Sequence, residues 1–268
     1  MGYNKWNDVS YDNTLFEVKT DGGEQGNEYL HYIGAETDAR KIQLPPQLQS
    51  LYMMFAGTDV EHGPYIPDGV TDVRFMFEDA QKLVEGSVVP DSVKYQAGMY
   101  DGCVNLSDAK NISKGAENID CMFSDCISLA KVPEIPDSVI SAIGAFAGCE
   151  NVREVHGGCN VKDARNIYAG MSNLEIPARE MNPEADMTDA FTGCIRIHER
   201  MEQGGSDIGS LPKSFGIDLD NYGPQARNLP VNTREKADPG IDREAMASEL
   251  VGGIVEQSDN VMDYAGRL

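Results

Sequence analysis

The feature that most constrains the fold of this chain is an aromatic residue that returns at a nearly fixed step. Through the middle of the sequence, an aromatic side chain recurs every 22 or 23 residues. Self-similarity at such a period is typical of a solenoid, in which each repeat forms one turn and stacks on the next. The aromatic positions of the seven repeats are Phe55, Phe77, Tyr100, Phe123, Phe146, Tyr168 and Phe191.

The residues that follow each aromatic also recur. Two residues after it comes Gly or Asp, which we expect to take a left-handed backbone conformation that closes a turn. Three residues after it comes a small or sulfur-containing residue, and six after it, in all but the first repeat, an aliphatic one. Cysteines that share one repeat position are predicted to form a column of reduced thiols in the core rather than a disulfide framework. They are Cys103, Cys126, Cys149 and Cys194.

The order of residues inside a repeat indicates where strands lie. Proline stands ten residues before four of the aromatics, at Pro45, Pro67, Pro90 and Pro136. Because proline fixes φ and removes a hydrogen-bond donor, a strand should lie just before it, as in the segment 129–135. A short helical turn should then carry the aromatic inward. We therefore predict an α/β repeat solenoid of parallel strands and short helical turns, with about seven repeats.

The two ends of the chain do not follow the repeat. The segment before the array reads as a degenerate capping turn, which a solenoid needs to cover its exposed core. After the array, a stretch rich in Gly, Pro, Asp and Asn indicates a linker or cap. Met246, Leu250 and Ile254 then fall on one face of a weak amphipathic helix. The predicted segments are an N-terminal cap at 1–41, the solenoid at 42–197, the linker or cap at 198–240 and the helix at 241–268.

The charge and hydropathy of the chain limit the classes of function that it can have. The chain carries 44 Asp and Glu against 22 Lys and Arg, a formal net charge of −22. This argues against binding to nucleic acid or to an anionic membrane, because both are bound through clustered Lys and Arg and the sequence has no such cluster. The N-terminus has no secretory pattern, and no stretch of about 18 apolar residues could span a membrane. We therefore expect a cytoplasmic protein, or part of a phage-type particle.

Three phrases of the array are similar to a known family. They are IPDSVISAIGAFAGCENV at 135–152, VPDSVKYQAGMYDGCVNL at 89–106 and ISKGAENIDCMFSDCISL at 112–129. They resemble the BspA-type leucine-rich repeats of bacteria, and the resemblance covers about 42–197. It implies a curved leucine-rich-repeat solenoid whose strand face binds other proteins, and many members of the family sit on cell surfaces. The family carries no catalytic residues to transfer.

Candidate binding residues follow from the predicted strands. Side chains two apart in a strand point to the same face, so positions eight and ten after each aromatic should share one surface. If the register slips by one residue, positions seven, nine or eleven would replace them. The candidates for partner binding are Tyr65, Glu85, Asp108, Lys110, Lys131, Glu154 and His156.

The sequence offers no constellation for chemistry. The four histidines stand at non-equivalent repeat positions, and no Ser/His/Asp or Cys/His set can be assembled. We expect no catalytic residue, no metal and no cofactor. The favoured function is a non-enzymatic protein-binding scaffold that uses the strand face, with an unidentified protein partner. The alternative is a structural subunit of a larger assembly, of phage or mobile-element type or a surface adhesin, which docks through its C-terminal tail.

Overall fold

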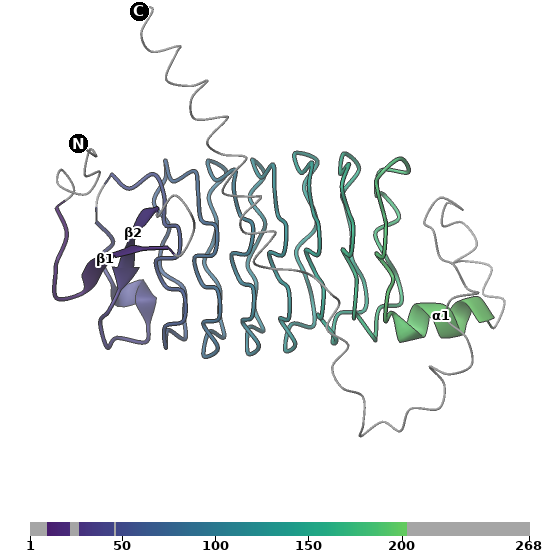
Figure 1. Ribbon diagram of the computed structural model, residues 1–268, viewed down its shortest axis with the longest axis horizontal. Coiled ribbons are helices and arrows are strands. Elements are labelled where there is room, and N and C mark those ends of the chain that lie inside the picture. The colour runs from purple at the N-terminus through teal and green to yellow at the C-terminus, as the bar shows by residue number, and fades with distance from the viewer. Residues whose placement is uncertain (1–9, 22–26, 46, 203–268) are drawn as a thin grey trace, which may run out of the picture.

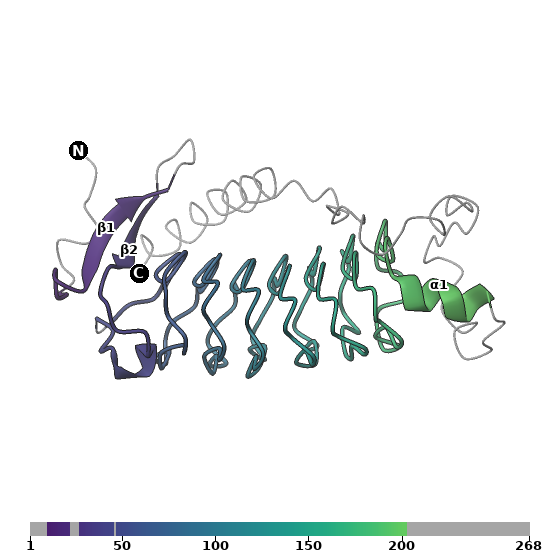
Figure 2. The ribbon, with the colours of Figure 1, turned by 90° about the horizontal axis from the view of Figure 1, so that it is seen from below.

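Successive turns of the chain stand side by side along the long axis of the molecule, between a hairpin near the N-terminus and the helix Ile195–Glu202 (Figure 1). The structure is a computed structural model that describes residues 10–21, 27–45 and 47–202. Figure 2 shows the same stack from below. None of the helices in these residues is long and apolar enough to cross a membrane. The elements are β1 (Phe16–Thr20), β2 (Glu28–Tyr32), the 3-10 helix η1 (Ala39–Lys41) and α1 (Ile195–Glu202).

Neighbouring turns are joined through two main columns of isolated parallel bridges. Between the columns, alternate N–H groups donate to the next turn, as when Phe77 N–H donates to the carbonyl of Met99 at 2.9 Å. The intervening N–H groups close tight turns within the same repeat, as when Glu78 N–H donates to Phe75 O at 3.1 Å. The first column pairs Asp38, His62, Glu85 and Asp108 in succession, and the second pairs Ser50, Asp72, Tyr95, Asn118, Ser141, Asp163 and Asp186.

This alternation corrects the prediction of continuous strands and helical turns. The segment 129–135 makes only one bridge, from Ile135 to Gly157, and no helical turn precedes Phe146 among the described residues. Pro133 lies inside that segment and has no N–H to donate, which weakens it as a strand. The repeat nature of the fold and its parallel stacking therefore hold, whereas the strands are reduced to bridges.

Left-handed residues set the path of each turn. The prediction for the position two after the aromatic is confirmed, because the residue there has positive φ in every repeat. A second left-handed position, two before the aromatic, was not predicted, and several non-glycine residues occupy it. The first set is Gly57, Asp79, Gly102, Asp125, Gly148, Gly170 and Gly193, and the second is Met53, Phe75, Gly98, Cys121, Gly144, Asn166 and Asp189.

The recurring aromatics lie in the core, as the repeat predicts, and the rings from Phe55 to Phe146 stack on one another. Phe77 and Tyr100 lie with ring centroids 5.5 Å apart and nearly parallel at 2°. Each of the seven aromatics is at most 4% exposed. Tyr100 and Tyr168 fit among the phenylalanines because their hydroxyls accept backbone N–H groups, that of Ser87 for Tyr100 and that of Ala178 for Tyr168, each at 3.2 Å. The register of the array is therefore correct.

The hairpin continues this core at the N-terminal end. Tyr32 of β2 donates its N–H to Met54 O at 2.8 Å, and its ring lies 5.3 Å from that of Phe55. Phe16 of β1 packs on Tyr32 at 5.7 Å. At the other end, α1 runs across the boundary predicted at residue 197. The rest of the predicted linker and the C-terminal helix lie outside the described residues.

Two of the repeats are one residue short, and the bridges show where the residue is missing. His62 lies seven residues after Phe55, whereas its bridge partner Glu85 lies eight after Phe77. The first short repeat therefore loses its residue between the aromatic and the bridge column. The other loses it near Gly157, which pairs with Ile135 across 22 residues. The second column keeps its pairing through both changes in length, and the first column keeps its pairing at His62.

The predicted cysteine column is confirmed. Each of its four thiols is free and donates to the carbonyl of an aromatic residue 26 positions earlier, at 3.0–3.2 Å. Burial raises the pKa of these thiols, that of Cys194 to about 12. Cys121 is also buried. Cys159, by contrast, is exposed, and its thiol contacts Asp137 Oδ1 at 3.0 Å.

The six cysteine thiols should therefore fall into a fast and a slow class when the native protein is labelled with a thiol reagent. We expect Cys159 to react promptly with a thiol reagent in the native protein, because it alone of the six cysteines is exposed. The other five should react only after unfolding, since the attacking species is the thiolate and burial disfavours it. Ellman titration of native and urea-unfolded protein measures both classes. Cys159→Ser is the control and should remove the fast class, and rapid reaction of the column cysteines would contradict the inward register.

Candidate functional site

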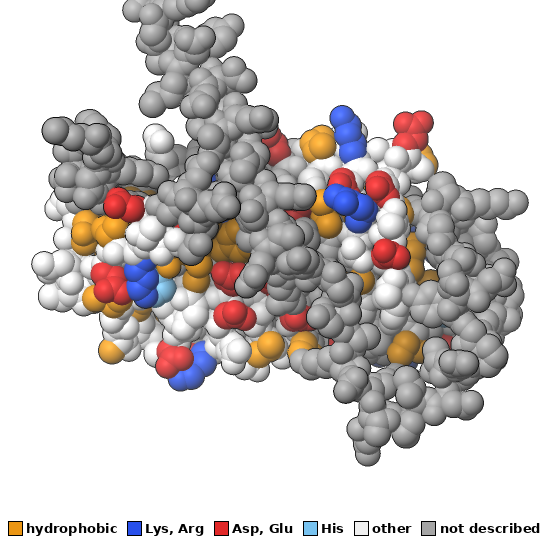
Figure 3. Space-filling view, viewed as in Figure 1, with side chains coloured by type: hydrophobic (Ala, Val, Ile, Leu, Met, Phe, Trp, Pro, Cys, Tyr) orange, Lys and Arg blue, Asp and Glu red, His pale blue; other side chains and the backbone are white. Residues whose placement is uncertain are grey.

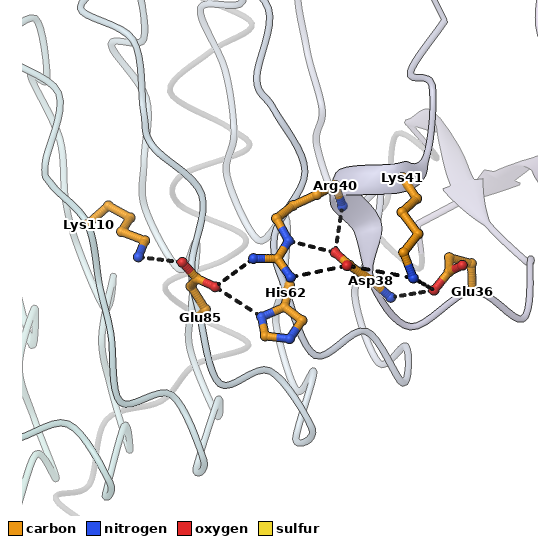
Figure 4. Close-up of polar contacts among 7 residues, drawn as sticks. All are labelled: Glu36, Asp38, Arg40, Lys41, His62, Glu85 and Lys110. Atoms are coloured by element: carbon orange, nitrogen blue, oxygen red, sulfur yellow. Dashed lines mark hydrogen bonds and ion pairs between the residues drawn. The ribbon is translucent and has the colours of Figure 1, made fainter.

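The first bridge column carries a network of ion pairs on the surface, with Glu85 at its centre (Figure 4). Glu85 Oε2 accepts from Arg40 Nη1 at 3.1 Å and lies 3.1 Å from His62 Nδ1. Glu85 Oε1 pairs with Lys110 Nζ at 2.5 Å, and Lys110 also pairs with Asp108. Lys110, with smaller contributions from His62 and Arg40, holds the pKa of Glu85 below its usual value. The stacking of three turns thus links residues that are far apart in sequence.

The network extends to the 3-10 helix η1. Arg40 binds Asp38 with two parallel bonds, from Nε at 2.7 Å and from Nη2 at 3.1 Å. These bonds lower the pKa of Asp38 from 3.8 to about 2. An acid with a lowered pKa stabilises the fold above its ordinary pKa, and this contribution is lost as the pH falls toward 2. Lys41 closes this end by pairing with Glu36 at 3.3 Å and Asp38 at 3.7 Å.

The structure brings together some of the predicted binding residues and separates the others. Glu85, Asp108 and Lys110 join in the network. Glu154 and His156 pair with each other, Oε2 to Nε2, at 3.7 Å on a later turn. The remaining two, Tyr65 and Lys131, are exposed and join neither of these groups of ion pairs, and the first column makes no bridge at Lys131 among the described residues.

Sequence reasoning missed Arg40 and His62. His62 was missed because its repeat is one residue short, so that the column position falls seven after the aromatic rather than eight. Arg40 lies in the segment predicted only as a cap. A signal for it exists in the sequence, because Asp-x-Arg occurs at Asp38, Asp72 and Asp163 and each copy forms the same two-bond pair.

A second cluster, on the other bridge column, was also missed. The guanidinium of Arg74 lies between two aromatic rings, 5.6 Å from the centroid of Tyr52 and 5.8 Å from that of Tyr95. It pairs with Asp72 through Nε and Nη2, each at 2.8 Å. The side chains of Arg74 and Asp72 are only 11% and 14% exposed. This cluster is a packed cation–π pair that joins turns, so it is poorly placed to meet a partner.

The ion pairs of the first bridge column limit the chemistry that its side chains can perform. Each carboxylate in the network already faces a cation, and the described residues hold no group of three or more His, Cys, Asp or Glu side chains that could bind a metal. Red and blue side chains lie against one another over the N-terminal turns in Figure 3, with a pale blue histidine beside them. The face presents fixed, alternating charges that remain partly exposed, with Glu85 28% and Arg40 52% accessible. Such a surface suits recognition.

Comparisons with known proteins found two similar solved structures. One is a leucine-rich repeat protein from Bacteroides ovatus, 22% identical with a TM-score of 0.42, in a match that covers 66% of this chain and 54% of that chain. The chain therefore spans about half the length of that protein. The other is the leucine-rich repeat protein of T. pallidum, 19% identical with a TM-score of 0.41, over 76% of this chain and 98% of that one. No family model and no curated protein matches the chain.

Proposed function

We propose that this chain is a non-enzymatic protein-binding scaffold built of BspA-type leucine-rich repeats, and that it binds through the face of the first bridge column. The repeated phrases with Pro-Asp-Ser-Val and Phe-x-Gly-Cys support the assignment of the repeats. In the same proposal, residues 1–41 cap the array, 198–240 form a linker or cap, and 241–268 form a weak helix.

The observation that carries the proposal is the pre-ordered charge network around Glu85. Exposed charged side chains normally lose rotamer entropy when a partner immobilises them. Here Glu85, Lys110 and Asp108 are already held by one another across two turns while they remain partly exposed. A partner that meets this face therefore finds its contacts in place.

Exposed apolar side chains lie close to the network in sequence and supply the anchors that a binding surface needs. Tyr65 is 73% exposed and Val88 is 66% exposed. They stand three residues after His62 and Glu85, which are bridge partners, so they occupy equivalent places on neighbouring turns. A tyrosine beside polar contacts is typical of the residues that dominate binding energy at interfaces.

The charge of the array indicates the chemistry of the partner. Residues 42–194 hold 23 Asp and Glu against 10 Lys and Arg. A basic surface on the partner protein would complement this field, raise the association rate and make binding weaken with added salt.

Two matched charge reversals test the proposal. Asp108→Lys and Glu117→Lys make the same change in net charge, and each removes one surface ion pair, with Lys110 and with Lys94 respectively. With the intact chain as bait, we expect Asp108→Lys to reduce capture of its partner about tenfold, as a lost charge contact does, and Glu117→Lys to change it little. Quantitative mass spectrometry of the captured proteins gives both values.

The two outcomes that would contradict the proposal are distinct. An equal loss in both variants would show that only net charge matters and that no particular face binds. No loss in either variant would remove the first column as the binding face, and would favour the alternative in which the segment 198–268 docks the chain into a larger assembly.

A further inference from the structure

The outer edge of β1, on the side away from β2, is paired with no other strand among the described residues. β1 pairs with β2 in antiparallel register, with Val18 opposite Leu30, and within the described residues the sheet has only these two strands. Figure 2 places β1 on the far side of β2 from the turns. β2 is covered on its other side because Tyr32 N–H bonds to the first repeat. An open edge of this kind is a template for another strand.

The hydrogen-bond pattern shows which groups of β1 face outward. Ile33 N–H donates to Leu15 O at 2.8 Å, and Asp21 N–H donates to Asn27 O at 3.0 Å. The odd-numbered residues of β1 therefore direct their backbone groups toward β2. In an antiparallel pair the direction alternates along the strand, so the even-numbered residues direct theirs to the open edge. They are Phe16, Val18 and Thr20. The N–H of Phe16 already donates to Asp12 O at 3.0 Å, so within the described residues a second strand would meet the carbonyl of Phe16 and both backbone groups of Val18 and Thr20.

The sequence of this strand, FEVKT, is complementary to itself when one copy is turned antiparallel to another. With Val18 opposite Val18 of a second copy, Phe16 faces Thr20, and all three outward-facing positions meet outward-facing positions. The same alignment sets Glu17 opposite Lys19 in both directions. These two side chains share one face and already pair at 3.2 Å within the strand, with 46% and 40% of their surface exposed.

Neighbouring registers are disfavoured by charge. The next alignment that keeps outward groups facing each other places Glu17 opposite Glu17, and the one on the other side places Lys19 opposite Lys19. Like charges directly opposite are destabilising in a sheet, whereas opposite charges are favourable. The register centred on Val18 is therefore selected by its own charges. It also places the half-exposed Val18, at 37%, against its own copy.

We propose that two copies of this chain associate through their β1 strands, about a two-fold axis at Val18, into a continuous four-stranded antiparallel sheet. The interface is isologous, as a two-fold axis requires. No residue of β1 takes part in the charge network of the first bridge column, so the proposal is independent of the partner-binding function. A single pair of strands buries little area, so the dimer should form only at high protein concentration.

A charge-swap experiment tests the register. Sedimentation velocity of the intact chain, over a concentration series from about 1 μM to about 1 mM, should show a reversible monomer–dimer equilibrium. Glu17→Lys and Lys19→Glu should each weaken dimerisation about tenfold, since each creates like charges on both sides of the axis. Mixing the two variants should restore association, because one copy then carries lysine at both positions and faces a copy that carries glutamate at both.

A backbone variant tests the hydrogen bonds separately. Val18→Pro removes an outward N–H, leaves the bonds to β2 in place and should abolish the dimer, since proline is tolerated on an edge strand. A thermal melt checks that the variant is folded, and the charge pair still decides the matter if it is not. A chain that stays monomeric throughout, single variants that dimerise like the wild type, or a dimer that appears only after residues 1–9 are removed would overturn the proposal.

Discussion

Replacing Phe123 with alanine should lower the free energy of unfolding by about 3–5 kcal/mol, the usual cost of removing a buried phenylalanine side chain. The ring is 0% exposed and lies between two others, 5.5 Å from Tyr100 and 5.8 Å from Phe146, with interplanar angles of 15° and 7°. Neighbouring turns cannot close the space, because their own rings are fixed by the backbone ladder. Urea denaturation followed by circular dichroism measures the loss.

Tyr65→Ala serves as the control for this experiment. The Tyr65 side chain is 73% exposed, so its removal should change the free energy of unfolding by no more than about 0.5 kcal/mol. A loss below about 1 kcal/mol for Phe123→Ala would mean that the aromatic stack does not hold the turns together.

The second large effect is expected at Gly157. Its φ of +88° is costly for any residue with a side chain, and an added Cβ would lie 2.1 Å from the carbonyl oxygen of Ile135. That oxygen belongs to the backbone and accepts the N–H of Gly158 at 3.1 Å, so it cannot move away without breaking the bridge. We expect Gly157→Ala to cost more than about 3 kcal/mol, the strain of a left-handed alanine together with a lost hydrogen bond.

Gly57→Ala separates the two causes of that loss. Gly57 also has positive φ, +64°, but an added Cβ there would meet nothing within 4 Å. It should cost only the conformational strain, about 1–2 kcal/mol. Comparison of the two melting temperatures isolates the steric part, and equal losses would show that the clash at Ile135 is relieved by a shift of the chain.

The core could be predicted from the sequence because burial is what the repeat encodes. Phe123, Phe146 and the cysteines recur at the same step as the turns, so their register follows once the period is known. The left-handed residues two after the aromatic were predicted for the same reason, since Gly and Asp mark them. Those two before the aromatic were not, because Phe75 and Cys121 give no such signal.

The hydrogen-bond pattern of the backbone and part of the candidate site could not be predicted from the repeat. A period in the side chains shows which residues are equivalent, but it does not show whether successive N–H groups bond to the next turn or close a turn locally. The prediction of a strand at 129–135 failed on that point. Glu85, Asp108 and Lys110 lie together, as expected from their positions in successive repeats. His62 could not be predicted in this way, because its repeat is one residue short and the sequence alone does not show where the residue is missing.

The two short repeats show how this architecture tolerates a change in chain length. The missing residue is taken once from the segment after Phe55 and once from the segment just before Gly157, and in both cases the bridges on either side remain paired. The segments between the two bridge columns, which we call arms, thus absorb the difference in length between repeats, while the columns keep successive turns paired. Gene-level insertions or deletions of single residues can accumulate in these arms without disrupting the stack. For a designer, the same arms are the places to graft a loop of choice, with the next turn still in register.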